Sequence, residues 1–464
     1  MMLRTRTSLL GSDPTERYRQ RTLPIQGADG STLSLDFESE TIDPRLTFTR
    51  ASEGAFVDRT GKIVTALSGS PRFDYHPITN KFLGLMLEAS MTNLMKRSQA
   101  FTNAYWNDTG NNTLAVDAVV GAGSPQDDLT ASSLTESFGV TSVPHFVTQA
   151  VGEFIPAANT PYTMSIWVKQ PTSGNIGRYI QLAFWTSGFG ATAYMNFDIQ
   201  SPGAVGSGGA GTTGTITPYK NGWYRITATA TSVASPTTSG FQLGFSTSTS
   251  SVRAEATIVP SGTEKTIYIW GPQTELGSAA TSVLITRTSQ ATRVADSLVS
   301  TGNGLANWFL NSYSAGTFFF CGAIINTVSG YNRLFALTQS ASISTATGSV
   351  PAINVGVAAS SSNQIFLNAF VAANNDVDIY VPVGSAVVNN TEFTLSVSYK
   401  AGDYRVSRKN LSATSSFGSV GTTWGVNMFF NAVNGVPFPV VWYKQFKFFP
   451  SRLSNEQQDV WSST

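Results

Sequence analysis

Short extended segments, each closed by a turn residue, recur along the whole chain and restrict it to an all-β fold. In Thr266–Trp270, apolar and aromatic side chains alternate between two faces, and Gly271–Pro272 is expected to end this strand. Residues 222–230 alternate in the same way after the turn signal Asn221–Gly222. Glycine, serine and threonine fill the loops between such segments, which disfavours helices there. We therefore expect antiparallel β-sandwiches.

The length of the chain implies several domains. A chain of 464 residues exceeds the ~250 to 300 residues over which one hydrophobic core keeps growing. A short helix is expected at the C-terminus, where Ser454 and Gln457 have the spacing of a capping box. We predict four parts in order: an extended docking arm over 1–30, a β-hairpin-rich module over 31–105, a first sandwich over 106–297 and a second sandwich over 298–464.

The surface is expected to be polar but nearly uncharged. Charged residues make up 12% of the chain, about half the ~25% of a typical domain, and the formal net charge is +1. Such a surface has no field that attracts a polyanion, so nucleic-acid binding is disfavoured. The chain has a single cysteine, its first residues do not contain the apolar run typical of a secretory signal, and it has no run of ~18 apolar residues. These features predict a soluble protein made in a reducing compartment, with no insertion into a membrane.

The residue types that carry chemistry form no catalytic constellation. The two histidines, His76 and His145, fall in different predicted parts, so neither a histidine-activated nucleophile nor a zinc site is expected. Acidic residues such as Asp36 and Asp198 are scattered, and no spacing singles out a pair for glycoside hydrolysis. We therefore expect no catalytic residues, no organic cofactor and a protein that is not an enzyme.

One group of aromatic residues is a candidate for carbohydrate binding. Trp185, Phe189 and Tyr194 flank a Ser-Gly-Phe-Gly loop. Aromatic rings stack on the apolar face of a sugar, while hydroxyl and amide groups satisfy its rim. Packing in the core is the alternative for each of the three rings.

Two further groups are candidates for a metal ion and for a partner subunit. Asp127, Asp128 and Asp296 are candidate calcium ligands, with solvated turn aspartates as the alternative. The arginine-rich start of the chain is a candidate for docking on another subunit, with a frayed terminus as the alternative. Its arginines are Arg4, Arg6, Arg17, Arg19 and Arg21.

Several motifs in about the first quarter of the chain resemble a module of tailed-bacteriophage structural proteins. In order, they are Phe48–Ser52, Val57–Asp58 with Gly61, Pro71–Tyr75, Gly84–Glu88, Thr92–Leu94 and the stretch 98–106. Their order and gaps are similar to those in tail-fibre and related virion-surface proteins. The resemblance implies an attachment module on the virion surface, after assembly in the host cytoplasm.

The remaining parts resemble two kinds of carbohydrate-binding sandwich. The second sandwich is similar to laminin-G and concanavalin-like lectin domains. The preceding part resembles the carbohydrate-binding-module-like jelly rolls of the same phage proteins, through Pro125–Ala131, Thr163–Lys169, Gly222–Arg225, Gln273–Gly277 and Thr292–Asp296.

Together these resemblances imply a structural tail fibre or surface appendage that presents lectin-like domains for multivalent adhesion to host-surface glycans. Expected partners are other virion proteins, host-surface glycans and further copies of the chain in a homo-oligomer such as a trimer. Two alternatives remain open. One is a capsid-decorating or appendage-building protein whose sandwiches pack on other virion subunits, and the other is a capsular polysaccharide depolymerase.

Overall fold

The computed structural model describes most of the chain. The described residues are 29–107, 114–118, 123–149, 152–301, 308–309, 314–325, 331–338, 352–358, 364–370, 376–381, 387–409, 411–416, 427–430 and 440–463. The candidate docking arginines, Arg4, Arg6, Arg17, Arg19 and Arg21, lie outside these residues. Their contact with a neighbouring subunit therefore stays a prediction.

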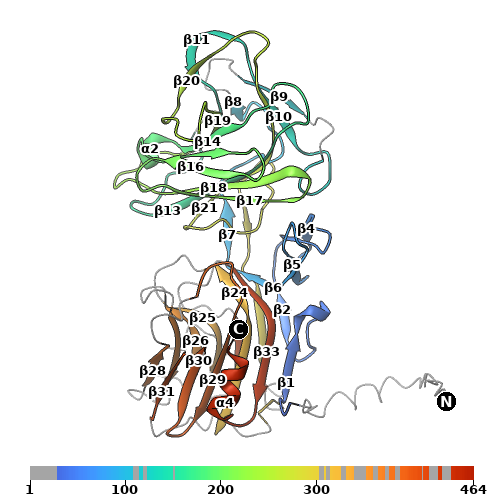
Figure 1. The fold of residues 1–464 in the computed structure, drawn as a ribbon, viewed down its shortest axis with the longest axis vertical. Helices are drawn as coiled ribbons and strands as arrows, with labels where there is room; N and C mark the ends of the chain where they lie inside the picture. The colour runs from blue at the N-terminus through green and yellow to red at the C-terminus, as the bar shows by residue number, and fades with distance from the viewer. Residues whose placement is uncertain are drawn as a thin grey trace, which may run out of the picture.

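Two antiparallel β-sandwiches lie one above the other along the long axis of the molecule (Figure 1). The inserted sandwich is built from strands between β8 (Trp106–Asn107) and β21 (Thr266–Leu276). The terminal sandwich combines strands from both ends of the described chain, from β1 (Leu33–Asp36) to β33 (Val440–Phe449). The predicted all-β class is confirmed.

The inserted sandwich has two six-stranded sheets around one core. The first sheet runs β17 (Thr213–Pro218), β18 (Trp223–Thr231), β13 (Pro161–Lys169), β21, β10 (Ser132–Glu136) and β9 (Leu114–Ala118). The second runs β16 (Ala204–Gly208), β15 (Tyr194–Asp198), β14 (Tyr179–Phe184), β19 (Phe241–Phe245), β12 (Phe146–Gln149) and β8. The alternation predicted in β18 holds, because Ile226 and Ala228 point into the core between the sheets.

Strand β21 continues through Gly271–Pro272, where the sequence had predicted its end. Ser165 pairs with Gln273 and Trp167 with Trp270, so β21 carries one extra residue between these pairs. Gly271 takes a φ of 62°, the left-handed conformation that a bulge of this kind requires. The glycine therefore bends the strand without ending it.

The terminal sandwich also has two sheets around one core. The first runs β31 (Leu411–Ser415), β30 (Tyr404–Arg408), β29 (Phe393–Lys400), β24 (Ala315–Ile325), β33, β6 (Phe82–Glu88) and β5 (Arg72–Tyr75), with β1 also on β33. The second runs β2 (Thr47–Thr49), β23 (Ser297–Thr301), β32 (Asn427–Phe430), β25 (Tyr331–Thr338), β26 (Ala352–Ala358), β27 (Gln364–Phe370) and β28 (Asp376–Tyr380). Phenylalanine side chains of β24 and β33 fill the space between the sheets.

The segment 31–105, predicted as a separate hairpin-rich module, is shared between the two sandwiches. Its strands β1, β2, β5 and β6 belong to the two sheets of the terminal sandwich. Leu33 pairs with Phe448 of β33, while Phe101 packs in the core of the inserted sandwich. The short pairs outside the large sheets are β3 (Gly54–Val57) with β4 (Ile63–Ala66), β7 (Met91–Asn93) with β22 (Ala291–Arg293), and β11 (Gly139–Pro144) with β20 (Ala256–Val259).

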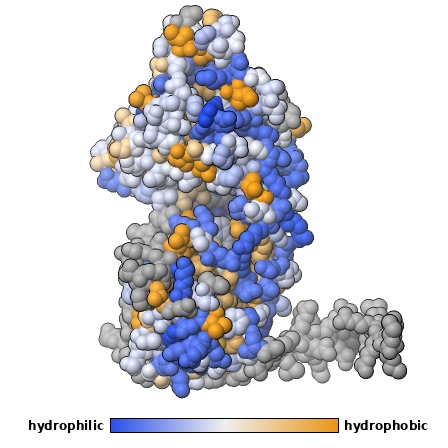
Figure 2. Space-filling model, in the orientation of Figure 1, coloured by the Kyte–Doolittle hydropathy of each residue, from blue (hydrophilic) through white to orange (hydrophobic). Residues whose placement is uncertain are grey.

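The described helices are short. They are η1 (Phe37–Ser39), α2 (Thr186–Phe189), η2 (Lys220–Gly222) and α4 (Asn455–Trp461). The predicted capping box of α4 is confirmed: Gln457 N donates to Ser454 Oγ (3.2 Å), and Ser454 N donates to Gln457 Oε1 (3.0 Å). None of the described helices has the length and apolar character needed to span a bilayer. Figure 2 shows that hydrophobic residues on one face of the molecule lie in small, separate patches.

Candidate functional site

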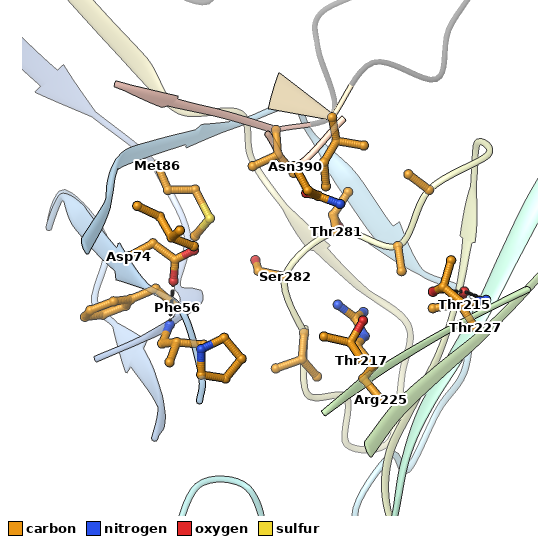
Figure 3. A pocket seen from close by; sticks show the side chains of 18 of the residues that line it. Phe56, Asp74, Met86, Thr215, Thr217, Arg225, Thr227, Thr281, Ser282 and Asn390 are labelled. Atoms are coloured by element: carbon orange, nitrogen blue, oxygen red, sulfur yellow. Dashed lines mark hydrogen bonds between the residues drawn. The ribbon is translucent and has the colours of Figure 1, made fainter. Parts of the chain in front are cut away.

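A cavity of ≈560 Å³ lies between the two sandwiches (Figure 3). The terminal sandwich contributes residues of β5, β6, β24 and β33 to its wall, the short β3–β4 pair contributes residues of both strands, and the inserted sandwich contributes one face of β17, β18 and β13. The segment 278–283, which follows β21, lines the space between them. Clefts between domains are common places for small ligands, so this cavity is the candidate site.

The wall from the inserted sandwich is rich in hydroxyl groups, and we call it the hydroxyl wall. Successive side chains of a strand point to opposite faces of the sheet. Ile216 and Ile226 point to the core, so the residues next to them in β17 and β18 point to the cavity. Side chains of β17 and β18 lie opposite each other in the pairs Thr213–Thr229, Thr215–Thr227 and Thr217–Arg225. The Oγ1 atoms of Thr215 and Thr227 are 2.7 Å apart.

Arg225 is the charged residue of the hydroxyl wall. Its side chain is buried, and its Nη2 donates to Ser165 Oγ at 2.9 Å. The guanidinium carbon lies 4.5 Å from the ring centroid of Trp167, within the range of a cation–π contact. These contacts hold a cation in place at one side of the cavity.

The opposite wall, from the terminal sandwich, is mainly apolar, and we call it the apolar wall. Its buried members are Met86, Ala323, Val440 and Trp442, with the partly buried Phe56 against them. Figure 3 shows Phe56, Asp74 and Met86 on one side of the cavity, and Thr215, Thr217, Arg225 and Thr227 on the other. The cavity therefore places an apolar surface opposite a hydroxyl surface.

One carboxyl group, that of Asp74, is embedded in the apolar wall. Its Oδ1 accepts from Val57 N and its Oδ2 from Trp442 Nε1, both at 2.8 Å. Burial raises the pKa of Asp74 to about 6, although both hydrogen bonds and Arg72 lower it; the charge of Glu88 raises it further.

Next to this wall lies a buried ionic cluster of Arg50, Arg72, Glu88, Arg293 and Asp296, of which Glu88 also lines the cavity. Glu88 pairs with Arg72 at 2.5 Å and with Arg293 at 3.3 Å, and all three side chains are completely buried. Asp296 pairs with Arg72 and, at 3.1 Å, with Arg50. Burial alone would raise the pKa of Glu88, but Arg293 and Arg72 outweigh it and hold that pKa at about 2.

The candidate calcium ligands are each engaged with protein groups. Asp296 belongs to the ionic cluster, Asp127 pairs with Lys62 at 2.5 Å, and Asp128 accepts from the hydroxyl of Ser124. Among the described residues, no group of three or more His, Cys, Asp or Glu side chains is placed to hold a metal ion. The structure therefore does not bring the three aspartates together as a calcium site.

The candidate sugar-binding aromatics divide into two kinds. Phe189 is 4% exposed and stacks on Phe184 with ring centroids 4.1 Å apart, so it packs in the core. Trp185 and Tyr194 are half-buried and lie on the outer side of the same sheet. The structure therefore separates Phe189 from the other two.

The sequence analysis missed the cavity residues. The alternation of Thr213, Thr215 and Thr217 is visible in the sequence, but it is also typical of any strand with one solvated face. Asp74 lies inside a motif that was interpreted as part of an attachment module. The position of the apolar wall opposite these threonines depends on contacts between distant segments.

No protein-family model matches the chain, and no curated protein matches it. Several solved structures resemble about a third of it. The CBM40 of the Ruminococcus gnavus IT-sialidase, bound to alpha2,3-sialyllactose, is 11% identical over 33% of this chain and 85% of that chain, with a TM-score of 0.28. The leech intramolecular trans-sialidase is 17% identical over 34% of this chain and 24% of that chain, with a TM-score of 0.28. The receptor-binding domain of the botulinum neurotoxin C/D mosaic serotype is 13% identical over 36% of this chain and 40% of that chain, with a TM-score of 0.28. Likeness at this level carries no inference about the ligand of this chain.

Proposed function

We propose that this chain is a non-enzymatic glycan-binding protein and that the cavity between its sandwiches takes a sugar residue. The observation that carries the proposal is the pairing of an apolar wall with a hydroxyl wall. A pyranose ring has the same division, with C–H groups on its faces and hydroxyl groups around its rim. The ring would lie against Met86 and Phe56, with its hydroxyls towards Thr215, Thr217 and Arg225.

The size of the cavity supports this proposal. Its volume of ≈560 Å³ falls within the ~300 to 1,000 Å³ of small-ligand pockets. The acids that line it are Asp74 and Glu88. Because Glu88 is neutralised by Arg72 and Arg293, these two do not provide the pair of free carboxyl groups that glycoside hydrolysis needs. Binding without turnover is therefore the function that these residues favour.

We further propose that the protein works as a tail fibre or surface appendage of a tailed-phage virion. The support for this step is the order of sequence motifs in about the first quarter of the chain. Other virion proteins, a homo-oligomer such as a trimer and host-surface glycans are the partners that this role requires. Weak contacts at single sites would be multiplied by the number of copies on the particle.

A glycan array followed by titration calorimetry tests the cavity. We expect the wild type to bind at least one neutral glycan, and the double variant Thr215→Val with Thr217→Val to bind it at least ~10-fold more weakly, because two hydroxyl contacts are lost. Valine keeps the shape of threonine. The matched control is Thr47→Val with Thr49→Val, at two exposed positions of β2. No bound glycan, or an equal loss in the control, would count against the cavity.

A further inference from the structure

A row of side chains crosses the outer face of the second sheet of the inserted sandwich, away from the cavity. Tyr194 of β15 pairs with Ala183 of β14, Ala183 pairs with Gln242 of β19, and Gln242 pairs with Thr148 of β12. Trp185 follows Ala183 by two positions, so it points to the same face. Trp185, which directly follows β14, and Tyr194 of the neighbouring strand β15 therefore belong to the same face of the sheet.

Arg253 lies across this row and is held there. Its Nη2 donates to Gln242 Oε1 at 2.8 Å and to the backbone carbonyl of Phe184 at 2.5 Å. Trp185 is fixed in turn, because its Nε1 donates to Thr148 Oγ1 at 3.0 Å. The guanidinium and the indole are therefore positioned before any ligand arrives, which lowers the entropy cost of binding.

The charge of Arg253 is not balanced by an acid. In the part of the chain that the structure describes, Arg253 has no ion pair, and its Nη1 is buried without a hydrogen-bond partner. Burial lowers the pKa of Arg253, while the nearby Tyr194 opposes this. Arg178 on the same sheet differs, since Asp198 pairs with it at 2.7 Å. A partly desolvated cation without a counter-charge is unfavourable, and an anion that approaches the exposed part of this half-buried side chain would relieve it.

We infer that Trp185, Tyr194 and Arg253 form a second binding site, for a sugar that carries a carboxylate. Arg253 pairs with the carboxylate, and the sugar ring lies against the aromatic side chains. This site is separate from the cavity and does not depend on it. The second site contains Trp185 and Tyr194, two of the three aromatic residues that the sequence predicts for sugar binding. The third, Phe189, packs in the core and is not part of the site, whereas Arg253 was not predicted from the sequence.

The test uses the full chain and two soluble probes, an oligosaccharide of glucuronic acid and its neutral glucose counterpart, followed by titration calorimetry. We expect the acidic probe to bind the wild type at least 10-fold more tightly than the neutral one. Arg253→Gln should remove this preference, and Arg253→Lys should retain part of it because lysine keeps the charge but loses the planar fork. Tyr194→Ala, which leaves the charge in place, should weaken binding of the acidic probe at least 3-fold.

Two control variants test whether the effect is specific to Arg253 and independent of the cavity. Arg178→Gln removes a charge from the same sheet and should leave the affinity for the acidic probe unchanged. The cavity variant, Thr215→Val with Thr217→Val, should also leave it unchanged, whether or not the cavity binds a glycan. Circular dichroism confirms the fold of each variant. Equal affinity for both probes, no binding by the wild type, or full binding by Arg253→Gln would overturn the second site.

Discussion

Asp74 shows how one buried carboxyl links the cavity to the pH of the solution. Burial holds its pKa at about 6, against an ordinary value of 3.8, so the folded state favours the protonated form. The stability that this preference contributes is fully present below the unfolded pKa and is lost as the pH rises through the folded pKa. The relevant window is therefore about pH 4 to 6, in which Glu88 stays charged because its own pKa is about 2.

We expect the free energy of unfolding of the wild type, relative to Asp74→Asn, to rise by about 1 kcal/mol from about pH 7.5 to about pH 5. Asparagine cannot titrate, and all other residues are common to both proteins, so the difference between them reports on Asp74. Urea unfolding at both pH values measures the difference. Parallel pH profiles for the two proteins would show that Asp74 does not titrate in this window.

At the scale of elements, the ionic cluster joins strands that are distant in sequence. Arg72 belongs to β5, Glu88 ends β6, and Arg293 ends β22, at the point where the chain returns from the inserted sandwich. Removing one partner of a buried pair leaves the other charge without compensation. The cluster therefore holds together the two segments through which the chain passes from one sandwich to the other.

Glu88→Gln keeps the shape of the side chain but removes the charge that faces Arg72 and Arg293. We expect it to lower the free energy of unfolding by roughly 3 to 5 kcal/mol, measured by chemical denaturation. Glu53 is exposed, and Glu53→Gln is the control, which should change the free energy of unfolding by no more than ~0.5 kcal/mol. Similar values for both variants would mean that the cluster does not stabilise the junction.

The sequence predicts the elements better than their partners. Alternation in β18 and the capping box of α4 are local signals, and both are confirmed. Nothing local indicates that Leu33 pairs with Phe448, or that Arg50 is buried against Asp296, since each of these contacts joins segments that are far apart in the sequence. Gly271 was misinterpreted because a glycine before proline is typical both of a strand end and of a bulge.

In the candidate sites, too, the residue types are easier to predict from the sequence than their contacts. The aromatic character of Trp185 and Tyr194 is visible in the sequence, but their common face with Arg253 depends on the register of three strands and on a loop. The cavity walls come from both sandwiches, so no single stretch of sequence contains them. Residue types can therefore be predicted, whereas their assembly into a site requires the tertiary structure.

At the scale of the whole molecule, the inserted sandwich interrupts the terminal one. The chain leaves through β7 and returns through β22, and these strands pair with each other, with Asn93 opposite Ala291. An insertion whose two ends lie side by side leaves the host domain with a complete set of strands. The terminal sandwich is therefore a discontinuous domain that requires β1, β2, β5 and β6 as well as β23 to β33.

This topology predicts opposite outcomes for two deletions. Replacing residues 94–290 by an Asn-Gly turn joins strands that are already paired, so we expect a soluble protein with one cooperative thermal transition. The fragment 298–464 should aggregate, because the loss of β1 and β6 exposes one edge of β33 and removes Leu85 and Leu87 from the core. Thermal unfolding followed by circular dichroism, with light scattering, distinguishes the two. A monomeric, cooperatively folding fragment 298–464 would instead mean that the terminal sandwich is complete without its N-terminal strands.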